Sequence, residues 1–191
     1  MSNAATRPIE TRFALPARTA LTIIAGTALM TLAAKVQIPF WPVPMTLHTM
    51  AVMAFAVAFG PRIAVSIFIA YLAAGAVGLP VFSGSPERGV GLAYMVGPTG
   101  GYLLGYLVAS WLVGALAVGK GTLGRVGAML AGMVPIYAIG MAWLAVYVPV
   151  GQLLAVGVLP FLLGDLVKIG VVAAGSMALP ASFARFRGKA E

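Results

Sequence analysis

The chain contains no cysteine among its 191 residues, and it has only four acidic residues and one histidine. Without cysteine there can be neither a disulfide framework nor a thiolate metal site. The few acids and the single histidine leave almost no material for a metal centre or a catalytic triad. Charged residues make up 8% of the chain, whereas an ordinary globular domain carries about 25%. The composition therefore excludes a soluble protein.

Hydrophobic residues, by contrast, make up 61% of the chain, and the mean hydropathy is +1.03. A helix needs about 20 apolar residues to cross a bilayer. The sequence predicts an all-α integral membrane protein, a bundle of six transmembrane helices, with Gly60-Pro61-Arg62 as a tight turn between the second and third. The six apolar runs are 18–36, 46–59, 62–77, 99–118, 125–148 and 153–179. They form one membrane domain (18–183), between a cytoplasmic N-terminal segment (1–17) and a basic cytoplasmic tail (184–191).

The net charge of +8 does not indicate that the protein binds nucleic acid, because the cations stand at the ends of hydrophobic runs and do not cluster. Cytoplasmic loops carry an excess of Lys and Arg. With the N-terminus in the cytoplasm, nine cations fall on that side and only Lys35 and Arg88 fall outside. The nine are Arg7, Arg12, Arg18, Arg62, Lys120, Arg125, Arg185, Arg187 and Lys189. We therefore expect a multi-pass protein of the inner (plasma) membrane with both termini in the cytoplasm.

Asp165 and Lys168 are the only charges in the last apolar run. An ionisable residue at membrane depth is expensive, and it is usually paired or functional. Three residues apart on a helix, the two side chains lie on one face. Arg185 follows Asp165 by about 30 Å of helix, which puts the pair in the outer half of the bilayer if Arg185 marks the inner interface. The pair is either a polar ligand site or an ion pair that only neutralises itself.

Both long connections fall outside in this topology. The first, Gln37 to Met45, contains three prolines in six residues, which forbid a regular helix, and it carries Phe40 and Trp41 as candidate interface anchors. The second, 79–96, is rich in Gly, Ser and Pro. We expect these outer loops to cap a ligand pocket, the alternative being ordinary loops with interfacial anchors.

Two further segments carry candidate ligand groups. Gly97-Pro98-Thr99-Gly100-Gly101-Tyr102 opens the fourth run, and the unpaired N–H groups of a helix start can receive a carboxylate. The same glycines also suit close helix packing. His48, beside Thr46 at the start of the second run, is a second-rank pocket candidate, although a lone histidine is more often structural.

Residues 114–120 imitate the start of a P-loop, but Gly121 stands where a hydroxyl is required, and no strand precedes the segment. Nucleotide binding is therefore not expected. A protein that moves a solute by ATP hydrolysis would need another subunit to do it.

Four motifs in this order are specific: Pro42-Val43-Pro44-Met45-Thr46-Leu47, Gly78-Leu79-Pro80-Val81-Phe82, Gly97-Pro98-Thr99-Gly100-Gly101-Tyr102-Leu103 and Gly164-Asp165-Leu166-Val167-Lys168. Together they resemble the BioY family, the biotin-binding substrate-capture (S) components of energy-coupling factor (ECF) transporters. The resemblance covers Thr19 to Leu179. Family members commonly carry Gln at the position of His48, and the Ala-x-x-x-Ala docking motif of many S components is absent from the first run.

The resemblance implies a biotin pocket near the outer face, a transmembrane coupling subunit and a pair of ATPase subunits as partners, no cofactor and no enzymatic activity. Asp165 suits the ureido N–H donors of biotin, and Ser83, Ser85 or Thr99 its carbonyl. The predicted ligand-binding residues are Trp41, Thr46, His48, Phe82, Ser83, Arg88, Gly97, Thr99, Gly100, Gly101, Tyr102, Asp165 and Lys168.

The carboxylate of biotin needs a cation or a helix N-terminus, which Lys168, Arg88 or the Gly97–Gly101 turn would supply. Trp41, Phe82 and Tyr102 could form an apolar sleeve around the ligand.

The alternative functions are an autonomous biotin carrier and a membrane-embedded enzyme with Asp165 as base. The sequence leaves open the oligomeric state, a homo-oligomer included, and whether the ATPase is dedicated or shared.

Overall fold

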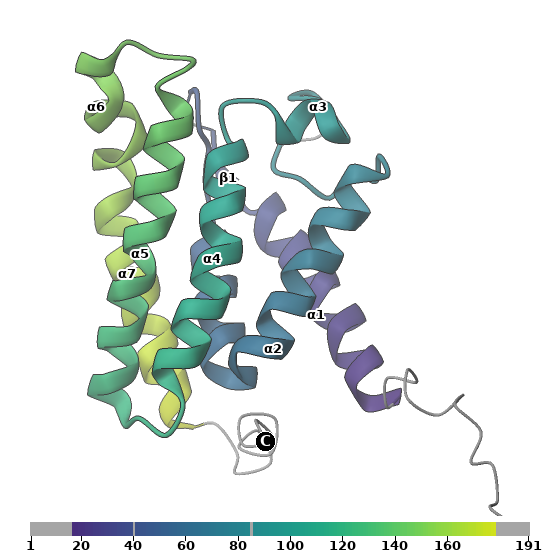
Figure 1. The fold of residues 1–191 in the computed structure, drawn as a ribbon, viewed down its shortest axis with the longest axis vertical. Coiled ribbons are helices and arrows are strands. Elements are labelled where there is room, and N and C mark those ends of the chain that lie inside the picture. The colour runs from purple at the N-terminus through teal and green to yellow at the C-terminus, as the bar shows by residue number, and fades with distance from the viewer. Residues whose placement is uncertain (1–16, 40, 85, 179–191) are drawn as a thin grey trace, which may run out of the picture.

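The computed structural model describes residues 17–39, 41–84 and 86–178, and the regular elements in this part are helices apart from one pair of two-residue strands (Figure 1). The all-α prediction is therefore confirmed. The strands are β1 (Gln37–Ile38) and β2 (Met45–Thr46), which pair antiparallel. The predicted basic tail, and the N-terminal segment up to residue 16, lie outside the described residues, as do Phe40, Ser85 and Arg185.

Five helical stretches are long and apolar enough to cross a membrane. They are α1 (Ala17–Lys35), α2 (His48–Ala76), α4 (Gly100–Ala117), α5 (Thr122–Leu144) and the stretch Val150–Met177. The last one consists of the 3₁₀ turn η2 (Val150–Gln152), α6 (Leu153–Gly157) and α7 (Leu159–Met177), and a short helix α3 (Leu92–Met95) precedes α4. The second and third predicted runs thus form a single element.

That element, α2, doubles back on itself at the predicted turn. Gly60 interrupts the helix with φ 77°, a left-handed conformation that favours glycine, and Pro61 follows it. Nε2 of His48 lies 2.8 Å from the hydroxyl of Tyr71, 23 residues further along. In a continuous helix those residues would be about 35 Å apart. The arms 48–59 and 62–76 are therefore two helices that turn back at Gly60.

Helix α4 occupies the centre of the bundle and packs closely on both α2 and α5 (Figure 1). A Cβ atom added at Gly101 would stand 2.3 Å from Cβ of Trp143 and 2.7 Å from the carbonyl oxygen of Ile139. One at Gly105 would stand 2.7 Å from Cα of Ile136. Small residues at such positions let the backbones of membrane helices approach. The glycine-rich start of α4 therefore serves packing.

Helix α7 presents one face to the interior, and this face carries its two charges. Phe161, Asp165, Lys168, Val172 and Ser176 are buried, at spacings of three and four residues. The opposite face is exposed, as expected for a helix against lipid. The break at Val158 separates α7 from α6 and places Pro160 in the first turn of α7, where a proline is tolerated.

Candidate functional site

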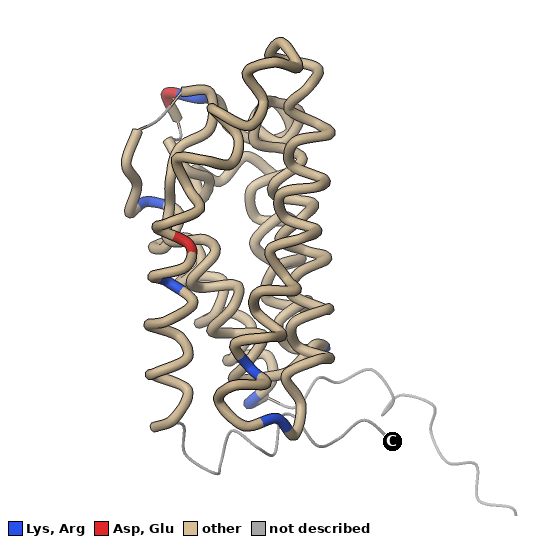
Figure 2. Tube along the Cα trace, turned by 90° about the vertical axis from the view of Figure 1, so that its left-hand side faces the viewer, with Lys and Arg blue, Asp and Glu red and all other residues tan. Residues whose placement is uncertain are grey.

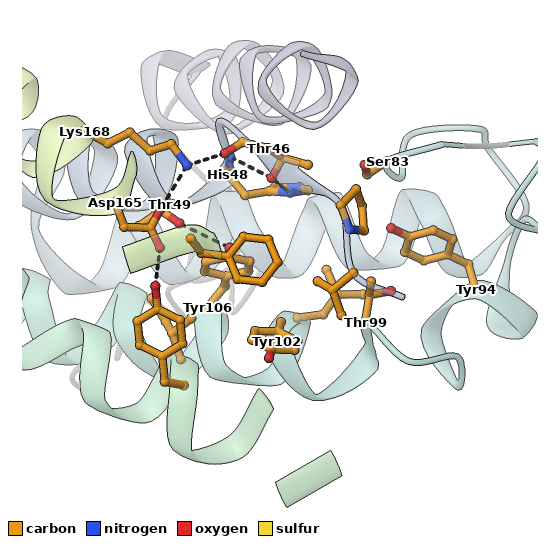
Figure 3. A pocket seen from close by; sticks show the side chains of 16 residues that line it. Thr46, His48, Thr49, Ser83, Tyr94, Thr99, Tyr102, Tyr106, Asp165 and Lys168 are labelled. Atoms are coloured by element: carbon orange, nitrogen blue, oxygen red, sulfur yellow. Dashed lines mark hydrogen bonds and ion pairs between the residues drawn. The ribbon is translucent and has the colours of Figure 1, made fainter. Parts of the chain in front are cut away.

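A cavity lies inside the bundle, between the beginning of α2, the first half of α4, the middle of α5 and the first half of α7 (Figure 3). Its empty space totals about 510 Å³ with the mouth included, but only about 40 Å³ of it admits the centre of a water-sized sphere. The walls therefore stand close together. The lining residues are Val43, Pro44, Thr46, His48, Thr49, Ser83, Tyr94, Thr99, Tyr102, Leu103, Tyr106, Ile136, Tyr137, Phe161, Asp165 and Lys168.

The charged end of the cavity is built on α7. Asp165 is 4% exposed and Lys168 9% exposed, and Nζ of Lys168 lies 2.9 Å from Oδ1 of Asp165. Nζ also donates to the carbonyl oxygen of Thr46 at 2.6 Å. The hydroxyl of Tyr137, on α5, donates to Oδ2 of Asp165 at 2.8 Å. Both carboxylate oxygens therefore have a donor, which is the condition for holding a charge away from water.

A chain of polar contacts leads from this end to the connection between α2 and α3. The hydroxyl of Thr46 lies 3.0 Å from Nδ1 of His48, whose Nε2 contacts the hydroxyl of Tyr71. That hydroxyl donates to the carbonyl oxygen of Val81 at 3.4 Å. His48 thus uses both ring nitrogens inside the protein. The contacts support a structural role for His48 at the edge of the cavity.

Most of the remaining lining hydroxyls come from α2, α3 and α4. Those of Thr49 and Tyr106 lie 3.2 Å apart, and the hydroxyl of Tyr102 donates to the carbonyl oxygen of Gly157 at 2.8 Å. Tyr102 therefore offers mainly its ring to the cavity. Burial raises the pKa of Tyr94, on the short helix α3, above its ordinary value.

The connection between α1 and α2 and the connection between α2 and α3 contact each other beside the cavity. Nζ of Lys35 donates to the carbonyl oxygen of Phe82 at 3.0 Å, and the hydroxyl of Ser83 donates to the side-chain oxygen of Gln37. The guanidinium of Arg88 donates to the carbonyl oxygen of Pro42 at 3.2 Å and stands 5.7 Å from the ring centre of Trp41. Val43 and Pro44 from one connection, and Ser83 from the other, line the cavity.

The structure brings seven of the thirteen predicted site residues to the cavity and places six elsewhere. The seven are Thr46, His48, Ser83, Thr99, Tyr102, Asp165 and Lys168. Trp41 is 79% exposed, and Arg88 packs over it. Phe82 is fully buried beside the cavity, stacked on Tyr94 with ring centres 4.7 Å apart.

Gly97, Gly100 and Gly101 belong to the contact of α4 with α5. The indole N–H of Trp143 donates to the carbonyl oxygen of Gly97 at 2.9 Å, and Cβ atoms at the other two glycines would collide with their neighbours. The first turn of α4 therefore reaches the cavity through Thr99 and Tyr102.

Sequence reasoning missed nine lining residues as site candidates, and Tyr137 is the most consequential of them. The nine are Val43, Pro44, Thr49, Tyr94, Leu103, Tyr106, Ile136, Tyr137 and Phe161. A hydroxyl in the middle of the apolar run 125–148 was a signal that could have singled out Tyr137. Nothing local indicates that it faces Asp165, since the two residues are 28 positions apart.

The fold and the cavity together define a helical membrane protein with a polar, partly charged pocket inside its bundle. The BioY family model matches residues 3–185. The chain belongs to the BioY family.

Curated relatives agree with this assignment. The chain is 36% identical over 149 residues to the biotin transporter BioY of Thermotoga maritima, covering 77% of this chain and 86% of that protein. It is 33% identical over 164 residues to the biotin transporter BioY2 of Lactococcus lactis, covering 83% and 88%. Among solved structures, the S-component for biotin from an ECF-type ABC transporter matches with a TM-score of 0.74 and 24% identity, over 92% of this chain and 96% of that one. That last likeness shows that the fold is shared.

Proposed function

We propose that this protein captures biotin outside the cell as the substrate-binding subunit of an ECF transporter. Partner subunits, a transmembrane coupling protein and a pair of ATPases, then drive import with ATP. The observation that carries the proposal is the buried Asp165, held by Lys168 and Tyr137 and lining a cavity of hydroxyls and aromatic rings in a chain of the BioY family. The curated relatives are biotin transporters by name.

The chemistry of the lining suits the ureido ring of biotin. A carboxylate has about four acceptor positions, and the bonds from Lys168 and Tyr137 use two of them. Asp165 can therefore accept the ureido N–H groups as charge-assisted bonds. Thr99 can donate to the ureido carbonyl, whereas the O–H of Ser83 is already donated to Gln37. The rings of Tyr102 and Phe161 supply apolar wall.

Nζ of Lys168 lies 2.9 Å from Oδ1 of Asp165, so the two opposite ends of one biotin cannot both bind there. In the alternative orientation, with the carboxylate of biotin in place of its ureido ring at this end of the cavity, Lys168 is a better candidate than Arg88 for binding the carboxylate. An ammonium has three N–H donors, and Asp165 and Thr46 receive two of them. Arg88 lies over Trp41 and does not line the cavity. Biotin and its neutral methyl ester should therefore be compared on wild type, Lys168→Met and Arg88→Met. Loss of the preference for the acid in Arg88→Met alone would move the assignment to Arg88.

We place the cavity in the outer half of the membrane, with six crossing helices and both termini in the cytoplasm. The Lys and Arg bias and the depth of Asp165 support this orientation. Because the cavity walls stand close together, a bicyclic ligand requires lining groups to move apart. The outer connections, joined by a few polar contacts, are the segments we expect to shift.

We propose no catalytic step for this cavity. Acid–base catalysis needs a positioned titratable group that can exchange a proton with the substrate. Both oxygens of Asp165 and both ring nitrogens of His48 are already engaged by neighbouring side chains. The arrangement therefore favours binding.

Calorimetric titration of the purified full-length protein with biotin, without nucleotide or metal, tests the proposal. We expect one-to-one binding, and no heat with thiamine, a vitamin of different shape and charge. Binding that required ATP or a metal ion would refute it. Uptake of labelled biotin by cells with and without the partner subunits separates a coupled subunit from an autonomous carrier.

A further inference from the structure

A second hollow lies on the outside of the bundle, between the first arm of α2 and the second half of α7. Its empty space totals about 780 Å³ with its open side included. Its lining is apolar except for one hydroxyl. The lining residues are Met50, Ala54, Phe55, Val57, Ala58, Phe59, Val171, Val172, Gly175 and Ser176. We call it the α2–α7 groove.

One end of the groove carries positive charge. Nη1 of Arg125 donates to the carbonyl oxygen of Ser176 at 2.9 Å, and Nε of Arg125 donates to that of Lys120 at 3.0 Å. Arg62 follows Phe59 by three residues, just beyond the turn at Gly60. The guanidinium of Arg125 is thereby anchored beside the last residue of the groove.

Arg125 forms no ion pair within the described part of the chain. Its two acidic residues are Asp165, which is paired with Lys168, and Glu87 in the outer connection. In Figure 2 the lower end of the bundle carries blue segments and no red ones, whereas red segments lie at mid-height and near the top, each with blue segments close by. An apolar groove therefore ends in a region that attracts anions.

We propose that the α2–α7 groove binds a phospholipid with an anionic headgroup, its acyl chain along the groove and its phosphate at Arg125. The fork of a guanidinium matches a phosphate, and the two backbone contacts use two of its five N–H donors. Basic pockets on the cytoplasmic side of membrane helices bind anionic headgroups in this way. The site is separate from the biotin cavity and does not depend on the proposed transport function.

Native mass spectrometry of the full-length protein in detergent tests the headgroup. Dioleoyl phosphatidylglycerol and dioleoyl phosphatidylcholine share their chains and differ in charge. We expect one phosphatidylglycerol to bind about fivefold more tightly than phosphatidylcholine, as one cation near the surface suggests. Arg125→Gln removes this preference. Arg18→Gln, at the beginning of α1, removes a cation that lacks a contact like that of Arg125 with Ser176 in the described structure, and it keeps the preference.

The groove itself is tested with a filled variant. A Cβ atom at Gly175 meets nothing within 4 Å, so Gly175→Leu fits without a clash and occupies the groove. Gly170→Leu is the matched control, because Gly170 lies on the same helix with equally open surroundings and does not line the groove. We expect Gly175→Leu to lose both lipids and Gly170→Leu to keep them.

Equal binding of the two lipids by wild type would overturn the proposal, as would lipid retention by Gly175→Leu at the level of Gly170→Leu. If a second copy of the chain covers the groove, Gly175→Leu changes the oligomeric mass and leaves lipid binding intact, which also refutes the lipid site. A failure of biotin binding would leave these outcomes unaffected.

Discussion

At the scale of single residues, Asp165 and Lys168 can form an ion pair and a polar ligand site at the same time. The ion pair is present, with 2.9 Å between Nζ and Oδ1, but the two side chains do not have each other as their only partners. Tyr137 and Thr46 share in holding the two charges, and both charged side chains also line the cavity. A buried pair that is held by further partners and faces a cavity is suited to bind a polar ligand.

Asp165→Asn should weaken biotin binding strongly and leave the protein folded. Asparagine keeps the shape but loses the charge, and hydrogen bonds to charged groups contribute about 1.5–3 kcal/mol. That range corresponds to roughly tenfold to a few hundredfold in affinity, measured by calorimetric titration. Circular dichroism serves as the folding control. An unchanged titration of the folded variant would mean that Asp165 only neutralises Lys168.

Tyr137→Phe should weaken biotin binding more modestly. The change removes the donor to Oδ2 of Asp165 and leaves the ring in place, so the carboxylate loses one of its two orienting contacts. A net hydrogen bond of about 0.5–1.5 kcal/mol predicts about two- to tenfold weaker binding.

Tyr147→Phe is the matched control, because the hydroxyl of Tyr147 donates to the carbonyl oxygen of Val96, away from the cavity lining. Equal affinities for the two variants would contradict a positioning role for Tyr137.

At the scale of elements, the contact between α4 and α5 decides the geometry of the site. Thr99, Tyr102 and Tyr106 on α4 face the cavity from one side, and Ile136 and Tyr137 on α5 complete it. The glycines of α4 bring the two backbones together, so a side chain added there must push the helices apart.

Gly101→Ala should therefore lower the melting temperature of the protein. The new methyl would stand 2.3 Å from Cβ of Trp143, and overpacking of this kind costs about 1–3 kcal/mol. Gly127→Ala, on α5 with nothing within 4 Å of the new methyl, should be neutral or slightly stabilising. Thermal unfolding of both variants in the same detergent is the measurement. A Gly101→Ala protein as stable as Gly127→Ala would show that the contact is loose.

At the scale of the whole molecule, the doubling back of α2 decides how often the chain crosses the membrane. The two arms of α2 are short. His48 on the first arm contacts Tyr71 on the second, and Gly60 lies at the opposite end of both arms. A Cβ at Gly114, near the end of α4, would stand 2.6 Å from Pro61. The turn therefore sits beside the end of α4, on the side of the Lys120 connection.

The absence of cysteine makes this topology directly testable by labelling. We expect a membrane-impermeant maleimide to label Glu87→Cys in intact cells, and to label Arg62→Cys and Lys120→Cys only after lysis. The positive-inside bias and the hairpin in α2 both require this pattern. Labelling of Arg62→Cys from outside would exclude six crossings with cytoplasmic termini.

The sequence alone determined the class of the protein, its helical runs, the turn at Gly60-Pro61 and the shared face of Asp165 and Lys168. These features depend on composition and on spacing along one helix, which are local properties. The motifs also sufficed to identify the family, because they occur in a specific order along the chain.

Only the tertiary structure decided which side chains meet. It brought Tyr137 to Asp165, turned Gly97, Gly100 and Gly101 toward α5, and stacked Phe82 on Tyr94 beside the cavity. In a soluble helix, a polar face would have shown which side points inward. In a membrane, lipid and protein interior are both apolar, so the sequence carries no such pattern, and close packing of the helices selects the inward face.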